Sequence, residues 1–186
     1  MDNLPKIWFL RHGQTEWNAE GRIQGRLNSD LTAQGRADAG KQAALIAPFV
    51  AEVRAGAGGI YVSPQGRAQE TARIALSGQD YAVDERLAEI NTGDWEGKLR
   101  SEIPRADTDI DTYTAAPGGE GLAGLAGRVE AFLAALTGPS IIVSHGILGK
   151  VLRARACGLD DAEMKALCNR QGVVYVLENG TEKILA

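Results

Sequence analysis

Short apolar runs, separated by polar and glycine-rich stretches, indicate a series of buried strands in this chain. Runs this short and rich in β-branched side chains are typical of strands in a sheet interior rather than of helices. The predicted strands are residues 7–10, 60–62, 140–143 and 173–177, with weaker candidates at 81–83 and 184–185. Asn179 and Gly180 stand between the two C-terminal segments and predict a closing hairpin.

Helical spacing of apolar side chains predicts helices between these strands. The clearest apolar stripe consists of Leu122, Leu125, Val129, Phe132, Leu133 and Leu136. Gly146 is expected to start another helix, which Gly158 ends. Thr32 and Ser63 are expected to cap two more, the second with Pro64 at its first position. In the helix after Thr32, the residues expected to face the core are Ala37, Ala44 and Leu45.

This alternation of strands and helices predicts a largely parallel sheet covered on both faces, which is a three-layer α/β/α sandwich. The 186 residues are expected to form one domain, residues 1–186, that is long enough to bury a core. Residues 13–31 are polar and glycine-rich and predict a long functional loop. Residues 100–121 are acidic and interrupted by prolines, and we expect them to form a cap or lid.

Composition narrows the class of protein. The net charge of −4 argues against broad non-specific binding of nucleic acid. The two cysteines are too few for a disulfide framework and fit a reduced compartment, where both would be small core residues. There is no apolar run of membrane-spanning length and no leader-like segment before the first strand. We therefore expect a cytoplasmic protein without nucleic-acid or membrane partners.

The two histidines of the chain, His12 and His145, occur in the same setting. Each follows an apolar strand and precedes a glycine. The carboxyl ends of parallel strands lie at one edge of the sheet, where ligands bind in open α/β folds. The two imidazoles are therefore expected at one site, as nucleophile, general base, charged clamp or metal ligand.

Two arginines favour an anionic ligand for this site. Arg11 directly precedes His12, and Arg67 lies in the first turn of the helix expected after Ser63. Guanidinium groups and free N–H groups at helix N-termini both bind phosphate. On its own, Arg67 would more often be a surface charge, and Arg11 with His12 would merely end a strand. Together with the histidines they favour phosphoryl transfer, which depends on positioning and charge stabilisation.

Phosphoryl transfer to water also needs a group that protonates the leaving alkoxide. Glu89 is preferred over Asp94 and Glu96 because it directly follows a strand-like segment. Residues 107–118 begin like a calcium loop but lack its turn glycine and its final glutamate. P-loop and dinucleotide fingerprints are missing from the sequence. With two histidines and no cysteine cluster, we expect no metal and no cofactor.

Taken in order, these segments resemble the histidine phosphatase superfamily, the phosphoglycerate mutase-like proteins. The matching segments are residues 10–18, 31–35, 63–71, 89–97 and 143–146, which extend over almost the whole chain. The ordered set is specific, although any one motif is only suggestive. The resemblance implies a mixed, mostly parallel sheet between helices.

The resemblance also implies a phosphohistidine mechanism, in which a covalent intermediate divides one difficult step into two. His12 would attack phosphorus, and Glu89 would act first as general acid and then as general base. The residues implied to hold the phosphoryl group or substrate are Arg11, Asn18, Gln24, Gly25, Arg67, His145 and Gly146. The expected ligand is a small phosphorylated metabolite.

Three functions stay open within this resemblance. The short chain is similar to the phosphatase branch, which includes α-ribazole phosphatase-like members, because mutases of this type carry an extended insertion. A phosphoglycerate mutase-type reaction is the second candidate, and a non-catalytic phosphate-binding module is the third. Gly121 stands where many relatives have serine, so substrate contacts from that loop are not predicted. The oligomeric state is also open, with a homodimer as one candidate.

Overall fold

A six-stranded sheet forms the middle layer of the computed structural model, which describes residues 4–186. Its strands are β1 (Ile7–Arg11), β2 (Ile60–Val62), β3 (Ala82–Val83), β4 (Ser140–Ser144), β5 (Val174–Glu178) and β6 (Thr181–Leu185). The order across the sheet is β3-β2-β4-β1-β5-β6. Strands β1 to β4 are parallel, whereas β5 is antiparallel to both β1 and β6. The expected mixed, mostly parallel sheet is confirmed.

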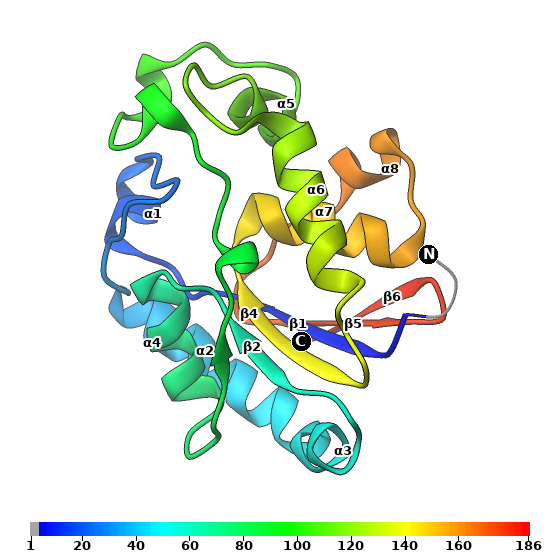
Figure 1. The fold of residues 1–186 in the computed structure, drawn as a ribbon. Helices are drawn as coiled ribbons and strands as arrows, with labels where there is room; N and C mark the ends of the chain where they lie inside the picture. The colour runs from blue at the N-terminus through cyan, green and yellow to red at the C-terminus, as the bar shows by residue number, and fades with distance from the viewer. Residues whose placement is uncertain (1–3) are drawn as a thin grey trace.

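Helices cover both faces of this sheet, as Figure 1 shows. The helices are α1 (Glu16–Glu20), α2 (Ala33–Ile46), α3 (Val50–Ala55), α4 (Gly66–Ala75), α5 (Asp109–Thr114), α6 (Gly121–Leu133), α7 (Gly146–Cys157) and α8 (Asp161–Ala166). Short 3₁₀ turns occur at Ala47–Phe49, Glu85–Leu87, Gly93–Trp95 and Arg100–Glu102. Helices α2, α3 and α4 lie on one face, and α6, α7 and α8 lie on the other. This arrangement confirms the three-layer α/β/α prediction.

The alternation of side chains along β1 builds both halves of the core. Trp8 and Leu10 belong to the apolar cluster under α2, α3 and α4. Ile7 and Phe9 belong to the cluster under α6, α7 and α8. All four side chains are buried. Helices cover both faces of β1, so every side chain from Ile7 to Leu10 is apolar. This is why the strand is a continuous apolar run in the sequence.

Strands β1 and β4 are neighbours, but the helices that follow them cover opposite faces of the sheet. Helix α2 follows β1 on one face, and α7 follows β4 on the other. Arg11 pairs with Ser144 in the parallel register, and the backbone N–H of His12 donates to the Ser144 carbonyl at 2.9 Å. The carboxyl ends of two such strands flank a crevice, the usual ligand site in open α/β sheets.

The loop after β1 packs tightly against the start of α2. A Cβ atom on Gly13 would lie 2.1 Å from the carbonyl oxygen of Gly35. There is therefore no room for a side chain at Gly13, after β1, or at Gly35, in the first turn of α2. The Thr32 hydroxyl caps α2 by accepting a hydrogen bond from the Gly35 N–H at 3.0 Å. The predicted cap is confirmed, and this contact fixes the chain directly after His12.

The predicted start of α4 is wrong by two residues. The helix begins at Gly66, and Gln65 rather than Ser63 precedes it. The Ser63 hydroxyl does not cap the helix because it lies 2.6 Å from the Nε2 atom of His145. A tertiary contact has therefore replaced the local capping bond that the sequence suggests.

The predicted inward face of α2 is also wrong for two of its three residues, whereas Leu45 packs against the core. Ala37 and Ala44 are exposed, and Leu45 is only partly buried. The buried face instead consists of Gly35, Asp38, Ala39, Gln42 and Ile46. Polar Gln42 lies inside because its Nε2 atom donates to the carbonyl oxygens of Arg11 and Val173, both at 3.0 Å.

The hairpin and helix-end predictions from glycine are confirmed. Asn179 and Gly180 adopt positive φ angles of 51° and 71° between β5 and β6, which is the backbone of a two-residue hairpin turn. Gly158 ends α7 with a φ of 68°. Helices α1 and α5 lie inside segments that the sequence predicts as irregular, since each is only one to two turns long.

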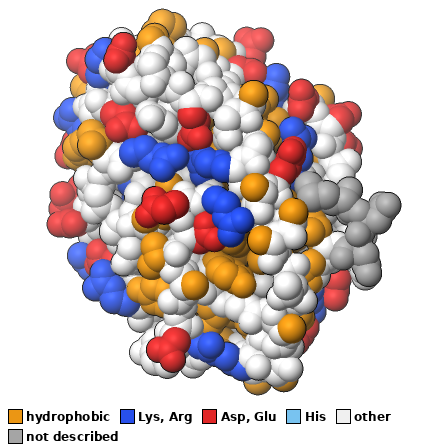
Figure 2. Space-filling model, viewed as in Figure 1, with side chains coloured by type: hydrophobic (Ala, Val, Ile, Leu, Met, Phe, Trp, Pro, Cys, Tyr) orange, Lys and Arg blue, Asp and Glu red, His pale blue; other side chains and the backbone are white. Residues whose placement is uncertain are grey.

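The surface in Figure 2 mixes basic and acidic side chains over the middle of the face in view. Apolar side chains gather below them on the same face. Among residues 4–186, none of the helices is long and apolar enough to cross a membrane.

Candidate active site

A cavity opens at the carboxyl ends of β1 and β4, and with its mouth it holds about 580 Å³. The predicted site residues on its wall are Arg11, His12, Asn18, Gln24, Gly25, Arg67, Glu89 and Gly146. His145 is fully buried behind the wall, with its ring centre 5.1 Å from that of His12. The structure therefore brings together residues from β1, the long loop, α4, the segment after β3, and α7.

The imidazole of His12 is held in one orientation by two contacts. Its Nδ1 atom lies 2.8 Å from the Gly13 carbonyl oxygen, which can only accept a hydrogen bond, so Nδ1 carries the proton. Its Nε2 atom accepts a hydrogen bond from Nε of Arg67 at 3.3 Å. Burial, and then the charges of Arg67 and Arg11, hold the pKa of His12 well below its usual 6.5. The ring is therefore neutral, and Nε2, whose one lone pair accepts from Arg67 in the free protein, is its nucleophilic atom.

Arg67 connects this histidine to the long loop after β1. Its Nη1 atom donates to the Leu27 carbonyl at 2.6 Å, and its Nη2 atom donates to the Gly25 carbonyl at 2.9 Å. Burial lowers the pKa of Arg67 to about 10, so the side chain remains a cation at neutral pH. The guanidinium group thus supplies a fixed positive charge beside the His12 Nε2 atom.

Several buried polar atoms of the site have no hydrogen-bond partner within the described part of the protein. They are Nε of Arg11, Oε1 of Gln24, Oγ1 of Thr92 and Nδ1 of His145. Such atoms are few in folded proteins, and each requires a physical explanation. Three of these residues, Arg11, Gln24 and Thr92, line the cavity, so its wall offers polar groups that the protein itself does not pair. The Arg11 side chain is otherwise fixed by donation from Nη1 to the Asn169 carbonyl at 2.5 Å.

Glu89 lies at the N-terminus of α7 and is bound by backbone N–H groups. Its Oε1 atom accepts from Ile90 at 3.0 Å and from Leu148 at 2.9 Å, and Oε2 accepts from Ile147 at 3.1 Å. Oε2 therefore retains one lone pair for a proton. Of the three carboxyl groups weighed from the sequence, Glu89 is the one on the cavity wall, whereas Glu96 binds the backbone N–H of Arg26 at 2.8 Å.

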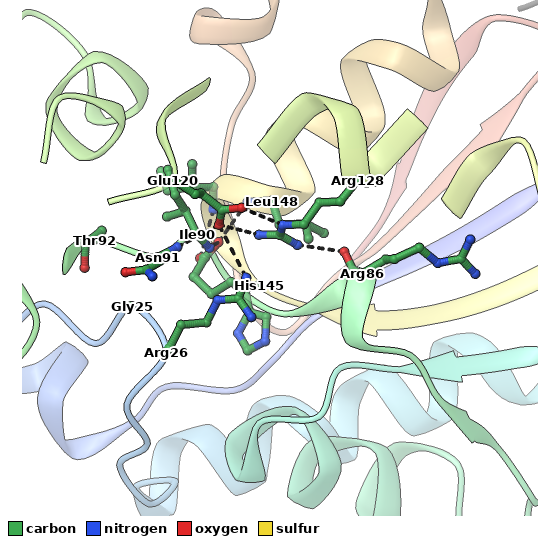
Figure 3. Close-up of polar contacts among 12 residues, drawn as sticks. Gly25, Arg26, Arg86, Ile90, Asn91, Thr92, Glu120, Arg128, His145 and Leu148 are labelled. Carbon is green, nitrogen blue, oxygen red and sulfur yellow. Dashed lines mark hydrogen bonds and ion pairs between the residues drawn. The ribbon is translucent and has the colours of Figure 1, made fainter. Parts of the chain in front are cut away.

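Glu120 holds the segment that follows Glu89, as Figure 3 shows. It accepts hydrogen bonds from the Asn91 N–H at 2.7 Å and from two nitrogens of Arg128, both at 2.8 Å. Arg26 lies 3.5 Å away on the other side. Although burial raises the pKa of Glu120, hydrogen bonds from Arg128 and Asn91 outweigh it, and the net pKa is lowered. The sequence around Glu120 does not predict these contacts, because the partners of Glu120 come from three separate segments of the chain.

The outer wall of the cavity includes residues that the sequence did not single out. Arg22, Arg100, Asp109 and Tyr113 line it, three of them from residues 100–121. The Asp109 carboxylate lies 2.8 Å from Nζ of Lys150, so its negative charge is balanced within the protein. The acidic segment therefore does not make this wall uniformly negative.

Because His12 and His145 are buried, we expect the protein to lose stability in mild acid. Burial and nearby cations, Arg67 above all, hold the pKa values of both His12 and His145 well below 6.5. Below pH 6.5 the unfolded chain binds protons that the folded protein excludes, so the free energy of unfolding falls by about 1.4 kcal/mol per histidine and pH unit. Above pH 6.5 the histidines contribute no slope.

Urea unfolding at pH 7.5, 6.5 and 5.5, in buffer without phosphate, measures this effect. The double variant His12→Gln/His145→Gln is expected to lose most of the slope between pH 6.5 and 5.5. An equal slope in the double variant would show that other groups cause the acid sensitivity.

Comparisons with known proteins identify the family of this chain. The family model of the histidine phosphatase superfamily (branch 1) matches residues 7–185. The chain belongs to this superfamily, which confirms the resemblance found in the sequence. Within residues 4–186, no group of three histidine, cysteine or acidic side chains is arranged to hold a metal ion.

Relatives of the chain include phosphatases and mutase-like proteins. It is 34% identical over 178 residues to the glucosyl-3-phosphoglycerate phosphatase of Mycolicibacterium vanbaalenii, covering 83% of this chain and 75% of that protein. It is 35% identical over 172 residues to a probable phosphoglycerate mutase GpmB of an Enterobacter species, covering 83% and 75%. The structure of the α-ribazole phosphatase from Shigella flexneri aligns with a TM-score of 0.76 and 25% identity, over 97% of this chain and 94% of that one.

Proposed function

We propose that this chain is a metal-independent phosphatase that hydrolyses a small phosphomonoester through a phosphohistidine on His12. The observation that carries the proposal is the orientation of the His12 ring. Nδ1 donates to the Gly13 carbonyl, which leaves the lone pair of Nε2 beside the Arg67 guanidinium. A neutral imidazole next to a fixed cation suits attack on an anionic phosphoryl group.

In the first step, Nε2 of His12 attacks phosphorus and the bond from phosphorus to the leaving oxygen breaks. Arg11 and Arg67 hold the non-bridging oxygens, and their charges stabilise the transition state. His145 and the start of α7 at Gly146 bind the same group from the neighbouring strand end. Protein cations supply the electrostatic stabilisation, so the proposed step needs no metal or cofactor.

Glu89 supplies and then removes the proton. It protonates the leaving alkoxide in the first step. In the second step it accepts a proton from water, which attacks phosphorus, breaks the bond to His12 and releases inorganic phosphate. The N–H groups that bind Glu89 keep the carboxyl group in place during both steps.

Glu89→Gln is expected to lower kcat/KM for an alkyl phosphate by about 10²- to 10⁴-fold, because glutamine cannot donate the proton. An aryl phosphate with an acidic leaving group needs less protonation, so its kcat/KM should fall much less. Asp94→Asn, which changes an exposed carboxyl group outside the cavity wall, is the control. An equal loss for both substrates would contradict the assignment of Glu89 as the general acid.

The cavity supports a small substrate. Its buried inner part is polar, with Gln24 and Thr92 offering side-chain groups that have no partner in the protein. Arg22 and Arg100 on the outer wall would tolerate a polar or anionic distal group. Two of the three relatives named above are, by their names, a glucosyl-3-phosphoglycerate phosphatase and an α-ribazole phosphatase, which also supports a small phosphorylated metabolite.

The proposal includes a cytoplasmic location, without nucleic-acid or membrane partners. Non-catalytic phosphate binding has little support, since the proposed nucleophile, cations and carboxyl group meet at one cavity.

A phosphoglycerate mutase-type reaction is the alternative, and the similarity to the probable mutase of Enterobacter favours it. Incubation with 3-phosphoglycerate, with and without a bisphosphoglycerate primer, separates the two. Phosphate release without isomerisation supports the phosphatase, whereas isomerisation that outpaces release supports the mutase.

Release of phosphate from p-nitrophenyl phosphate in the presence of a chelator tests the proposed function. The wild-type protein is expected to turn over many times under these conditions. Stoichiometric binding without turnover would contradict the proposal. A screen of sugar phosphates, nucleotides and phosphoglycerates then identifies the substrate.

A further inference from the structure

The loop between α8 and β5, residues 167–173, places one more polar side chain on the wall of the active-site cavity. Asn169 lines the cavity together with Arg11 and Gly146, and its side chain is partly buried. The mechanism proposed above uses Arg11 and Gly146 but gives Asn169 no part. Its neighbours on the wall indicate what its amide group can bind.

Contacts from the protein interior fix the backbone of this loop. Arg153 is fully buried, and its Nη2 atom donates to the Cys168 carbonyl at 2.5 Å. The Tyr175 hydroxyl accepts a hydrogen bond from the Arg170 N–H at 2.6 Å and donates to the Arg170 carbonyl at 3.0 Å. The chain is therefore anchored on both sides of Asn169. A side chain on such a segment begins from a fixed place, which suits a binding group.

The amide of Asn169 presents its N–H group to the space above Gly146. A Cβ atom on Gly146 would lie 2.7 Å from Nδ2 of Asn169 and 3.3 Å from Nε of Arg11. Both of these nitrogens are hydrogen-bond donors. The Arg11 Nε atom is also buried and has no partner within residues 4–186. Two donors from separate segments therefore border one small space.

The start of α7 adds a third donor at the same place. Gly146 is the first residue of this helix, where backbone N–H groups have no partner inside the helix. The N–H groups of Ile147 and Leu148 are already bound by the Glu89 carboxylate. The N–H of Gly146 is the one left for a ligand. Donors that surround one point suit an anionic oxygen, because charge-assisted hydrogen bonds are the strong ones.

We propose that Asn169 is a phosphoryl-binding residue. Its Nδ2 atom donates to the non-bridging oxygen that also meets Nε of Arg11 and the N–H of Gly146. This inference rests on the proposed function, because the oxygen belongs to the phosphoryl group that His12 attacks. It adds a neutral donor from the C-terminal part of the chain to the cations from β1 and α4.

Calorimetric titration with inorganic phosphate at pH 7.5 tests this contact without turnover. Asn169→Ala is expected to weaken phosphate binding by about 10- to 100-fold, the loss of one hydrogen bond to a charged group. Asn169→Asp has nearly the same size but turns a carboxylate towards the anion, so it should weaken binding further. Both variants keep the backbone carbonyl that receives Nη1 of Arg11. Asn169 has no positive φ angle, so alanine can adopt its backbone conformation.

Arg170→Gln is the matched control, since Arg170 is the next residue of the loop but is exposed and lies outside the cavity wall. This variant loses a full charge, yet its phosphate affinity should change by less than about twofold, because salt screens exposed charges. Wild-type affinity in folded Asn169→Ala, or equal weakening in Arg170→Gln, would overturn the proposed contact.

Turnover of p-nitrophenyl phosphate separates this inference from the proposed function. Asn169→Ala is expected to lower kcat/KM by about 10- to 100-fold, in line with its loss of phosphate binding. An inactive wild type whose phosphate binding depends on Asn169 would reject the phosphatase and leave the contact intact. An active wild type that Asn169→Ala matches in phosphate binding and in kcat/KM would reject the contact alone.

Discussion

His12→Ala is expected to reduce hydrolysis of p-nitrophenyl phosphate by on the order of 10⁶-fold, which is the size of loss when a covalent nucleophile is removed. The variant keeps Arg11, Arg67 and the rest of the cavity but has no atom at the position of the His12 Nε2. Steady-state assays in a chelator, with unfolding curves to show that the variant is folded, measure this loss. Activity close to wild type would reject His12 as the nucleophile.

His145→Ala provides the matched comparison, because the chain has one other histidine and it lies beside the first. Removal of one group that stabilises transition-state charge costs about 10²- to 10³-fold. His145→Ala should therefore remain measurably active and still form a phosphoenzyme. If His145→Ala were the inactive variant and His12→Ala the active one, the two roles would be reversed.

Arg67→Lys is expected to lower kcat/KM by about 10²- to 10³-fold although it keeps the charge. Lysine cannot reproduce the three separate bonds to His12, Leu27 and Gly25, because it has one nitrogen in place of a planar fork. The substitution should therefore disturb both the nucleophile and the loop.

Arg73→Lys is the control for this effect, since Arg73 lies in the same helix but is exposed. Binding of vanadate, measured by inhibition, should weaken in Arg67→Lys and stay unchanged in Arg73→Lys. A loss of less than threefold in Arg67→Lys would mean that charge alone, and not the forked geometry, is what the site requires.

Sequence patterns predicted the parts of this molecule that depend on short-range signals. The apolar run before His12 and the one before His145 each identify a strand, and neighbouring strand ends then bring the two rings together. The sandwich and the closing hairpin follow from such local patterns. Among the cavity-lining residues, Asn18, Gln24 and Gly25 were implied only by the family resemblance, and Arg22, Arg100, Asp109 and Tyr113 were not predicted. The family match over residues 7–185 confirms the identification drawn from them.

Local signals failed where a distant partner outcompetes them. Ser63 reads as a helix cap, yet its hydroxyl binds His145, which is 82 residues away in the sequence. Gln42 is polar but buried, because its side chain donates to two backbone carbonyls, one in β1 and one directly before β5. No sequence motif identifies Gln65, because its hydrogen bonds to Gly25 and Glu89 form only when the fold brings these distant segments together.

The most direct test of the central claim is to trap the phosphoenzyme and locate its phosphoryl group. Wild-type protein mixed with an aryl phosphate is quenched in alkali, which preserves phosphohistidine, and its peptides are mapped by mass spectrometry. One phosphoryl group per chain is expected on His12. It should accumulate in Glu89→Gln and be missing from His12→Ala. A phosphoryl group on His145 or another residue, or turnover without any covalent intermediate, would contradict the account.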